Sequence, residues 1–342
     1  MTTSTKKPEE MPTAKPILDI LWECYKPAIL KAALELEVWD KVASEGTTAA
    51  EIAEAEGWDP TGTRMLMDVL CSMELLGKQK GKYHLVPVAD HYLVPGKSSY
   101  MGDYVLLDMG WEGFGQLADA IRTGRRPIME DWTGERFAQI WTSRFAPRRL
   151  APARGLDTFT ATWEKLGVTA DSGLRVLDIG CGSGIRTLAL ARQHPDIKVT
   201  LQELPPVLAV AVELAENLGV SQQVATLPGD LQKVDFGQDD FDLIFMGHIL
   251  HFFGPKDVAS ILKRAYAALV PGGELIIADV IADEERREAE NALLAAIWLY
   301  GVSADGDMFS FTELNDLLQG AGLVDVSLIR EDGEDFVRAR RP

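Results

Sequence analysis

Residues 175–184 read Arg-Val-Leu-Asp-Ile-Gly-Cys-Gly-Ser-Gly and carry the clearest structural signal in the chain. The first half of this stretch is largely apolar and stops at a glycine, which predicts a short buried strand. Glycines then occupy alternate positions: Gly180, Gly182 and Gly184. Without a Cβ they let the backbone turn sharply and approach a ligand closely. Residues 185–192 follow with apolar side chains at helical spacing. The unit is therefore a strand, a glycine loop and a helix whose first N–H groups are free to bind a ligand.

The spacing of these glycines separates two kinds of nucleotide site. A dinucleotide fingerprint, G-x-G-x-x-G, would need its third glycine at position 185, where the chain has Ile185. The observed G-x-G-x-G spacing, preceded by Asp178, resembles the first motif of class I S-adenosylmethionine-dependent methyltransferases. A nicotinamide dehydrogenase on the same kind of sheet remains the alternative at this point.

Strands and helices continue to alternate after the glycine loop. Further strands are predicted at residues 197–203, 224–227, 241–246 and 274–280. Pro205 and Pro255 begin two of the helices between them. This alternation predicts an α/β fold, a Rossmann-like parallel sheet with helices on both faces. Asp332-Gly333 between two extended runs predicts a closing antiparallel hairpin.

Composition limits the function further. At 342 residues the chain exceeds the usual size of one domain, which predicts two domains. The formal net charge of −18 disfavours nucleic acid and anionic membrane as partners, because the mean field repels phosphates. The sequence has no apolar run long enough to span a bilayer. Its three cysteines form no pairwise motif, which fits a cytoplasmic protein without a zinc site. Residues 1–15 are polar, and we expect a disordered tail there.

The first helical segment, residues 17–36, is strongly apolar. Pro27 is expected to break or kink this segment. A small isolated domain would struggle to bury such a face, so we expect a homodimer through residues 16–95.

The remainder of residues 16–95 predicts a winged helix. Thr48 can begin one helix with a capping box, Asp59 and Pro60 begin the next, and residues 80–82 turn between two short strands. A DNA-reading helix needs basic and amide side chains, but the helix after Pro60 has Arg64 as its one basic residue. A packing role is therefore favoured, and a winged-helix regulator that senses a cofactor stays open as the rival function.

Residues 96–169 predict a helical linker rich in large side chains, ahead of a catalytic domain at residues 170–342. Most aromatic side chains at helical spacing pack inward, but a few can line a pocket for a flat organic ligand. The candidate pocket residues are Met109, Trp111, Trp141, Phe145, Leu299, Ser303 and Met308.

Short sequence motifs after the glycine loop narrow the resemblance to one family. VLDIGCGSG at 176–184, an acid at Glu203, Gly229-Asp230, HILHFF at 248–253 and LVPGGELIIAD at 269–279 occur in sequence. Their order and spacing resemble the small-molecule O-methyltransferases, which include caffeate, hydroxyindole and bacterial polyketide enzymes. This resemblance implies an N-terminal winged-helix dimerisation domain, S-adenosyl-L-methionine as cofactor and a hydroxyl acceptor on an aromatic or polyketide-like molecule.

The cofactor residues follow partly from the chain and partly from the resemblance. An acid at the end of the second strand, Glu203, can accept both ribose hydroxyls. Asp230, after the third strand, could accept from an adenine amino group. Together with the resemblance this gives the expected cofactor site as Asp178, Gly180, Gly182, Glu203, Asp230, Leu231, Gly247 and His248.

His251 falls where the family keeps its catalytic histidine. Transfer from a sulfonium requires alignment of the acceptor oxygen and removal of its proton, and an imidazole titrates near working pH. In the family's plant members two glutamates flank this histidine, whereas the matching positions here hold Asp279 and Met308. Asp279 can orient His251, and Asp307 could replace Met308 after a one-residue slip. This departure leaves C- or N-methylation open. A metal on His248 and His251 is disfavoured because no third ligand suggests itself.

Overall fold

Seven strands in the described part of the chain pair into one sheet, in the order β5-β4-β3-β6-β7-β9-β8. The computed structural model describes residues 13–97, 99–102, 105–106, 114–125, 138, 141–142, 152–168, 173–331 and 334–342. Residues 1–109 and 110–342 form two compact units. The sheet belongs to the second unit.

The first five strands of the sheet run parallel, and the last two close it as an antiparallel hairpin. The parallel strands are β3 (Arg175–Ile179), β4 (Lys198–Glu203), β5 (Val224–Pro228), β6 (Phe241–Gly247) and β7 (Leu269–Asp279). The hairpin consists of β8 (Val324–Glu331) and β9 (Glu334–Arg340), and the predicted turn at Asp332-Gly333 lies outside the described residues. The prediction of a parallel sheet closed by an antiparallel pair is confirmed.

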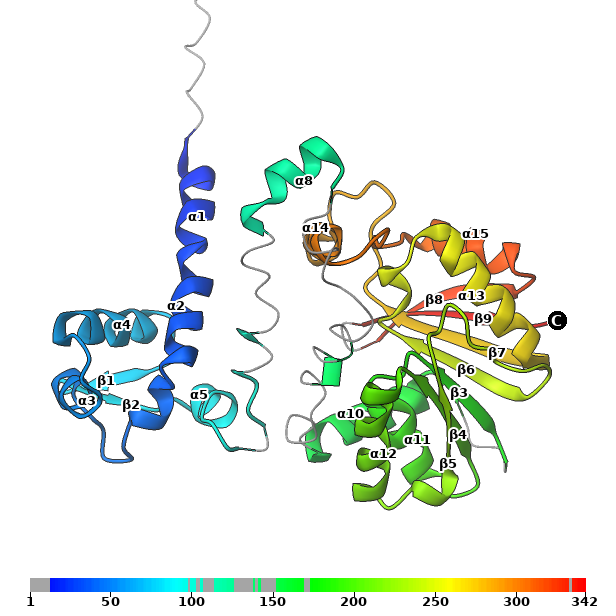
Figure 1. The fold of residues 1–342 in the computed structure, drawn as a ribbon, viewed down its shortest axis with the longest axis horizontal. Helices are drawn as coiled ribbons and strands as arrows, with labels where there is room; N and C mark the ends of the chain where they lie inside the picture. Colours follow the sequence, from blue (N-terminus) through cyan, green and yellow to red (C-terminus); the bar gives the residue numbers. More distant parts are fainter. Residues whose placement is uncertain are drawn as a thin grey trace, which may run out of the picture. The chain divides into compact units, whose positions relative to one another are not determined.

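Helices cover both faces of this sheet (Figure 1). One face packs against α13 (Pro255–Ala268) and α15 (Phe311–Gly320). The other packs against α10 (Pro152–Lys165), α11 (Ile185–Gln193) and α12 (Pro205–Asn217). Along β6, Ile244 and Met246 point into the first core, whereas Leu243 and Phe245 point into the second. β6 is therefore buried on both sides, as expected for a central strand of a parallel sheet.

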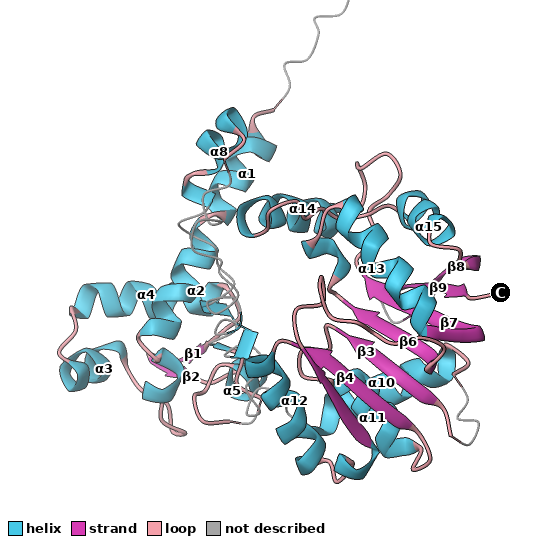
Figure 2. Cartoon of the chain, turned by 45° about the vertical axis from the view of Figure 1, so that its right-hand side comes forward, coloured by secondary structure: helices cyan, strands magenta, loops and turns pink. Residues whose placement is uncertain are grey.

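The second unit contains further helical elements. They are α8 (Leu117–Thr123), η4 (Ser221–Gln223), η5 (Leu250–Phe252) and α14 (Glu290–Val302). The η5 turn is separated from the end of β6 by two residues and carries His251. The carboxyl ends of β3, β4, β6 and β7 therefore meet the glycine loop and η5 at one edge of the sheet, where open α/β folds bind ligands. Figure 2 shows the strands of the sheet side by side.

The first unit is helical with a two-stranded wing. Its elements are α1 (Lys15–Glu23), α2 (Tyr25–Glu35), η1 (Val38–Lys41), α3 (Ala49–Glu56), α4 (Pro60–Ser72), β1 (Gly77–Gln79), β2 (Lys82–His84) and α5 (Pro87–Tyr92). Thr48 and Glu51 form the predicted capping box, and Asp59 caps α4. β1 and β2 pair antiparallel around Lys80-Gly81, so the predicted wing is present.

The break in the first helical segment lies at Cys24, three residues before the proline expected to cause it. Pro27 sits in the first turn of α2, where its missing N–H is not needed. Its ring would instead clash with the carbonyl one turn earlier, so the helix divides upstream. Among the described helices, none combines the length and apolarity needed to cross a membrane.

Candidate active site

The glycine loop between β3 and α11 has a backbone that other residues would strain. Gly180, Gly182 and Gly184 have φ angles of 64°, 55° and 69°. A Cβ on Gly180 would also lie 2.6 Å from Cγ1 of Ile249. The loop needs glycine at this position both for its conformation and for the approach of the segment after β6.

Side chains at the end of β4 hold this loop in place. The Gly180 N–H donates to Oε1 of Gln202 at 3.2 Å, and the Gly182 N–H donates to Oε2 of Glu203 at 3.1 Å. Nε2 of the fully buried Gln202 also donates to the carbonyl of Gly229 at 2.7 Å. Two neighbouring residues therefore tie the glycine loop to the loop after β5.

Two carboxyl groups lie beside the glycine loop, that of Asp178 buried and that of Glu203 half-buried. Burial raises the pKa of Asp178 to about 7, although Oγ1 of Thr187 donates to it at 2.5 Å. Burial also raises the pKa of Glu203, against the lowering effect of the N–H groups of Leu204 and Gly182. Buried carboxyl groups with raised pKa values favour a ligand that brings positive charge.

A cavity of about 370 Å³ opens in front of these carboxyl groups. Aromatic rings form much of its wall: Trp141, Phe159, Phe245, Phe252 and Trp298. The rings of Trp141 and Phe252 meet edge to face with centroids 5.7 Å apart. Both His248 and His251 also line the cavity, so one space brings together the glycine loop, the acids and the histidines.

His251 and Asp279 form a buried pair at this cavity. Nδ1 of His251 lies 2.8 Å from Oδ1 and 3.0 Å from Oδ2 of Asp279. Asp279 is the last residue of β7, and its Oδ1 also accepts from the N–H of Val280 at 2.8 Å. The pKa of this carboxyl is lowered: burial opposes ionisation, but the adjacent imidazoles outweigh it. An ionised carboxylate only accepts, so Nδ1 carries the proton and Nε2 is the basic nitrogen.

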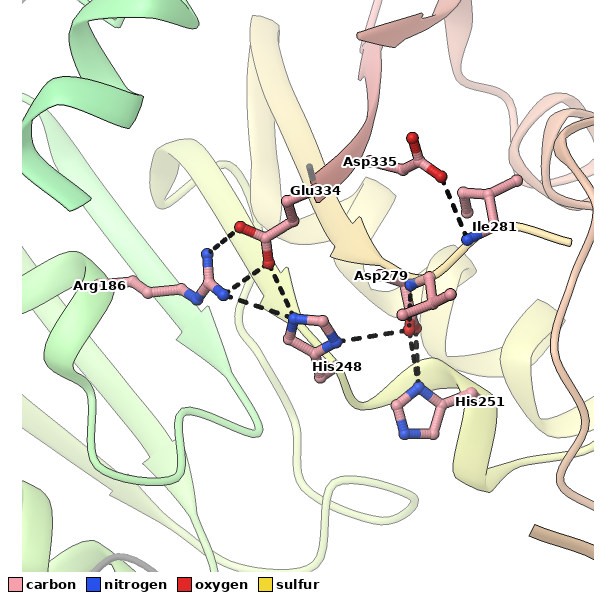
Figure 3. Close-up of polar contacts among 8 residues, drawn as sticks. Arg186, His248, His251, Asp279, Ile281, Glu334 and Asp335 are labelled. Atoms are coloured by element: carbon pink, nitrogen blue, oxygen red, sulfur yellow. Dashed lines mark hydrogen bonds and ion pairs between the residues drawn. The ribbon is translucent and has the colours of Figure 1, made fainter. Parts of the chain in front are cut away.

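His248 joins this pair to a second carboxylate (Figure 3). Its Nδ1 lies 3.6 Å from Oδ1 of Asp279, and its Nε2 lies 2.8 Å from Oε1 of Glu334. Arg186 binds the same carboxylate with two nitrogens, at 2.9 Å and 2.6 Å. The cluster of polar contacts therefore extends from the His251–Asp279 pair to Glu334 in the closing hairpin.

Two family models match the chain, one on each unit. The O-methyltransferase domain matches residues 114–324, and the O-methyltransferase dimerisation domain matches residues 18–95. The chain belongs to the O-methyltransferase family.

Relatives of this O-methyltransferase match it over nearly its whole length. A 3-hydroxy-5-methyl-1-naphthoate 3-O-methyltransferase from Streptomyces sahachiroi is 28% identical over 92% of this chain and 90% of its own. Mouse acetylserotonin O-methyltransferase is 28% identical over 93% of this chain and 85% of its own. Among solved structures, an O-methyltransferase from Nostoc punctiforme has a TM-score of 0.83 at 22% identity, covering 97% of this chain and 100% of its own.

The expected cofactor residues of the O-methyltransferase occupy two places. Those that line the cavity are Asp178, Gly180, Gly182, Glu203, Gly247 and His248. Asp230 lies in the loop after β5, where its carboxylate pairs with Lys233 at 2.9 Å. Leu231 is buried in the core beside α13. Gln202 links this loop to the glycine loop through Gly229.

The expected pocket residues also lie in different places: at the cavity, in a neighbouring apolar cluster and outside the described residues. Trp141 lines the cavity, whereas Leu299 and Met308 pack in a cluster with Phe252. Ser303 is the C-cap residue that follows α14, and its hydroxyl donates to the carbonyl of Leu299 at 2.9 Å. Met109, Trp111 and Phe145 lie outside the described residues.

Asp307 takes no part in the His251–Asp279 pair. Its Oδ1 accepts from the N–H of Met308 at 2.8 Å and lies 3.4 Å from Arg286. Within the described ranges, no cluster of three or more His, Cys, Asp or Glu residues is arranged to hold a metal ion.

Some residues at the site escape sequence reasoning. Gln202 and Thr187 support the glycine loop but belong to no recognised motif. Arg186 follows the loop by two residues, and its place at the start of the helix beside a ligand-binding loop is the signal that identifies it. Glu334 carried none, because its partner Arg186 is 148 residues away.

Proposed function

We propose that this O-methyltransferase transfers the methyl group of S-adenosyl-L-methionine to a hydroxyl of an aromatic small molecule, with His251 as general base. The observation that carries the proposal is the buried pair at the cavity wall. Because Asp279 holds Nδ1 of His251, the basic Nε2 is left to take the acceptor's proton.

The residues around the glycine loop fit the cofactor. Bound S-adenosylmethionine supplies a methyl group on a positively charged sulfur, which is electrophilic without further activation. The carboxyl groups of Asp178 and Glu203 would offset that charge, and Glu203 would accept from the ribose hydroxyls. Asp230 would accept from the adenine amino group. The positive-φ glycines leave the loop without side chains that would block close approach.

The aromatic wall supports the choice of acceptor. Trp141, Phe252 and Trp298 offer flat faces and edges to a ring system. Orientation of the acceptor against His251 would then supply much of the rate, because proton removal and alignment are the tasks left to the protein. The solved structure of an O-methyltransferase from neocarzinostatin biosynthesis, in complex with S-adenosylmethionine and 2-hydroxy-5-methyl naphthoic acid, matches this fold with a TM-score of 0.70 at 20% identity.

The remaining parts of the proposal concern the whole chain. Residues 16–95 would form the dimerisation domain of a homodimer, residues 96–169 would complete the pocket, and residues 170–342 would bind the cofactor. Cys24, Cys71 and Cys181 are all free thiols, which supports a reducing, cytoplasmic location. The net charge of −18 supports a function without nucleic acid.

Methyl transfer from labelled S-adenosylmethionine to a panel of phenolic and naphtholic acceptors tests this function. We expect a product that is heavier by one methylene and carries a new methoxy carbon by NMR. A new carbon–methyl or nitrogen–methyl signal would overturn the O-methyl assignment. Binding of NADH without binding of S-adenosylmethionine, measured by calorimetry, would overturn the cofactor. Sequence-dependent DNA binding with no methyl transfer would favour the regulator.

A further inference from the structure

A chain of charged side chains leads from the glycine-loop helix to the Asp279–His251 pair (Figure 3). Arg186 is the second residue of α11 and binds both carboxylate oxygens of Glu334. Oε1 of Glu334 lies 2.8 Å from Nε2 of His248. Nδ1 of His248 faces Oδ1 of Asp279 at 3.6 Å. The chain thus connects α11, the first residue of β9, the segment after β6 and the end of β7.

The backbone of His248 is held in an unusual conformation. Its φ angle is 53°, in the left-handed region that few non-glycine residues adopt, and its N–H donates to the carbonyl of Ala278 at 2.8 Å. Such a conformation persists when surrounding contacts fix it. Here the ring lies between two carboxylates, one at each nitrogen, so Glu334 and Asp279 set its orientation.

Nε2 of His248 lies within hydrogen-bond distance of Glu334, and Nδ1 makes an ion-pair contact of 3.6 Å with Asp279. A carboxylate at each nitrogen stabilises the positively charged ring, whereas Arg186, whose Nη2 lies 3.4 Å from Nε2, opposes it. Burial would lower the pKa of this ring, but the interactions with Asp279 and Glu334 outweigh it and raise the pKa to about 9. Burial would raise the pKa of Glu334, but its contacts with His248 and Arg186 outweigh this and lower the pKa to about 2.

The charges of the cluster then balance without a proton on Nε2 of His251. Arg186 and His248 are positive, and Glu334 and Asp279 are negative. The charged and titratable groups facing His248 are Arg186 of α11, Asp279 of β7, Glu334 of β9 and His251 of its own segment. Because His248 already neutralises Asp279, less negative charge is available to hold an extra proton on His251.

We propose that Glu334 is a positioning residue for methyl transfer: it holds His248 protonated against Asp279 and so keeps His251 in its proton-accepting form. The inference rests on the proposed function, in which His251 is the base. Glu334 touches neither the reacting atoms nor His251, and it acts through His248.

Glu334→Gln tests the proposal because it keeps the shape of the side chain and removes its charge. Glu331→Gln is the matched control, since Glu331 lies on the same hairpin and pairs with Lys165 near the surface at 3.5 Å. In ligand-free protein labelled with ¹⁵N-histidine, the His248 ring signals, assigned with His248→Gln, should titrate about 1–2 pH units lower in Glu334→Gln. Glu331→Gln should titrate like the wild type.

The kinetic readout is the acidic limb of the kcat profile against pH. In Glu334→Gln this limb should move to higher pH. A neutral His248 no longer offsets the negative charge of Asp279, which then acts on His251 alone. Turnover on the limb should fall by about tenfold for each pH unit of movement, and it should recover at high pH. The KM for S-adenosylmethionine should stay unchanged. His248→Gln should move the limb in the same direction, which keeps the test available if Glu334→Gln does not fold.

An unchanged limb in either folded variant, or an unchanged His248 titration in Glu334→Gln, overturns the role of Glu334. Wild-type methyl transfer that depends on His251 would leave the proposed function standing in that case. If the wild type transfers no methyl group to any acceptor, the proposed function falls and this inference falls with it.

Discussion

Asp178 shows at the scale of one residue how a binding site costs stability. Burial raises the pKa of its carboxyl to about 7, above the ordinary value of 3.8. Between these values the folded protein holds a proton that the unfolded chain releases, so the free energy of unfolding falls as pH rises from about 4 to about 7. A positively charged ligand would offset this cost.

Asp178→Asn removes the charge and should stabilise the ligand-free protein. Its urea midpoint should exceed that of the wild type by a margin that grows from about pH 4 to about pH 7 and then levels off. The variant should also bind S-adenosylmethionine more weakly at pH 8. Asp316→Asn, on the exposed side of α15, is the control and should follow the wild type. A margin that is the same at every pH would contradict the assigned ionisation of Asp178.

Single residues at this site differ in how far the sequence predicts them. His251 and Asp279 follow from motif positions that are 28 residues apart in the sequence. In the structure, Nδ1 of His251 lies 2.8 Å from Oδ1 of Asp279. Arg186 and Glu334 are 148 residues apart, and their pairing depends on how the closing hairpin returns to the sheet. No local pattern specifies that geometry, so the contact becomes visible only in the folded chain.

At the scale of elements, β4 does more than provide a carboxylate. Its last two residues, Gln202 and Glu203, bind the glycine loop, and Gln202 also binds the loop after β5. The glycine loop is therefore positioned by its neighbouring strand. Its own sequence supplies the freedom to bend, and β4 selects one conformation.

Gln202→Leu should destabilise the protein by about 2–4 kcal/mol, because the N–H of Gly180 and the carbonyl of Gly229 both lose a partner in a buried setting. Affinity for S-adenosylmethionine should fall with it. Gln222→Leu, at an exposed position after α12, serves as the control. Urea unfolding and calorimetric titration measure the two effects. Wild-type stability and affinity in Gln202→Leu would show that β4 does not hold the loop.

Element boundaries show where tertiary structure overrides local signals. The helix is interrupted at Cys24, three residues before Pro27. The ring of Pro27 is tolerated in the first turn of α2 but would clash with the carbonyl one turn earlier, so the proline causes an interruption that lies upstream of it. β7 begins at Leu269, five residues before the predicted start at Glu274. The Pro271-Gly272-Gly273 segment resembles a turn, yet it is part of β7 and forms an irregularity there: Leu269 pairs with Phe241 of β6, and regular pairing resumes at Glu274. The number and order of the sheet strands, in contrast, follow from the alternation in the sequence.

At the scale of the whole molecule, α1 carries an unusual apolar surface. Ile17 and Ile20 are each 73% exposed, and Trp22 is 67% exposed. None of the residues of α1 is buried in the single chain. Large exposed apolar surfaces of this kind mark interaction sites, and the dimerisation-domain match covers this helix from residue 18. The expected partner is a second copy of the chain.

Ile20→Glu should weaken the homodimer, because a charge would be buried at the contact without a partner. We expect light scattering at micromolar concentration to give the mass of a dimer for the wild type and a shift toward the monomer for the variant. Leu294→Glu on α14, at a residue that is 58% exposed in the other unit, is the control. A monomeric wild type at this concentration would count against the homodimer.

His251 is the proposed base for methyl transfer, and the function of the whole molecule depends on it. The direct measurement is single-turnover methyl transfer by His251→Ala at neutral pH, together with calorimetric titration of S-adenosylmethionine. His194→Ala, just past the end of α11, is the control. The transfer rate of His251→Ala should fall about 10²–10⁴-fold with cofactor affinity nearly unchanged, and the loss should shrink as pH approaches the acceptor's own pKa. Full wild-type turnover by His251→Ala at neutral pH would contradict the account.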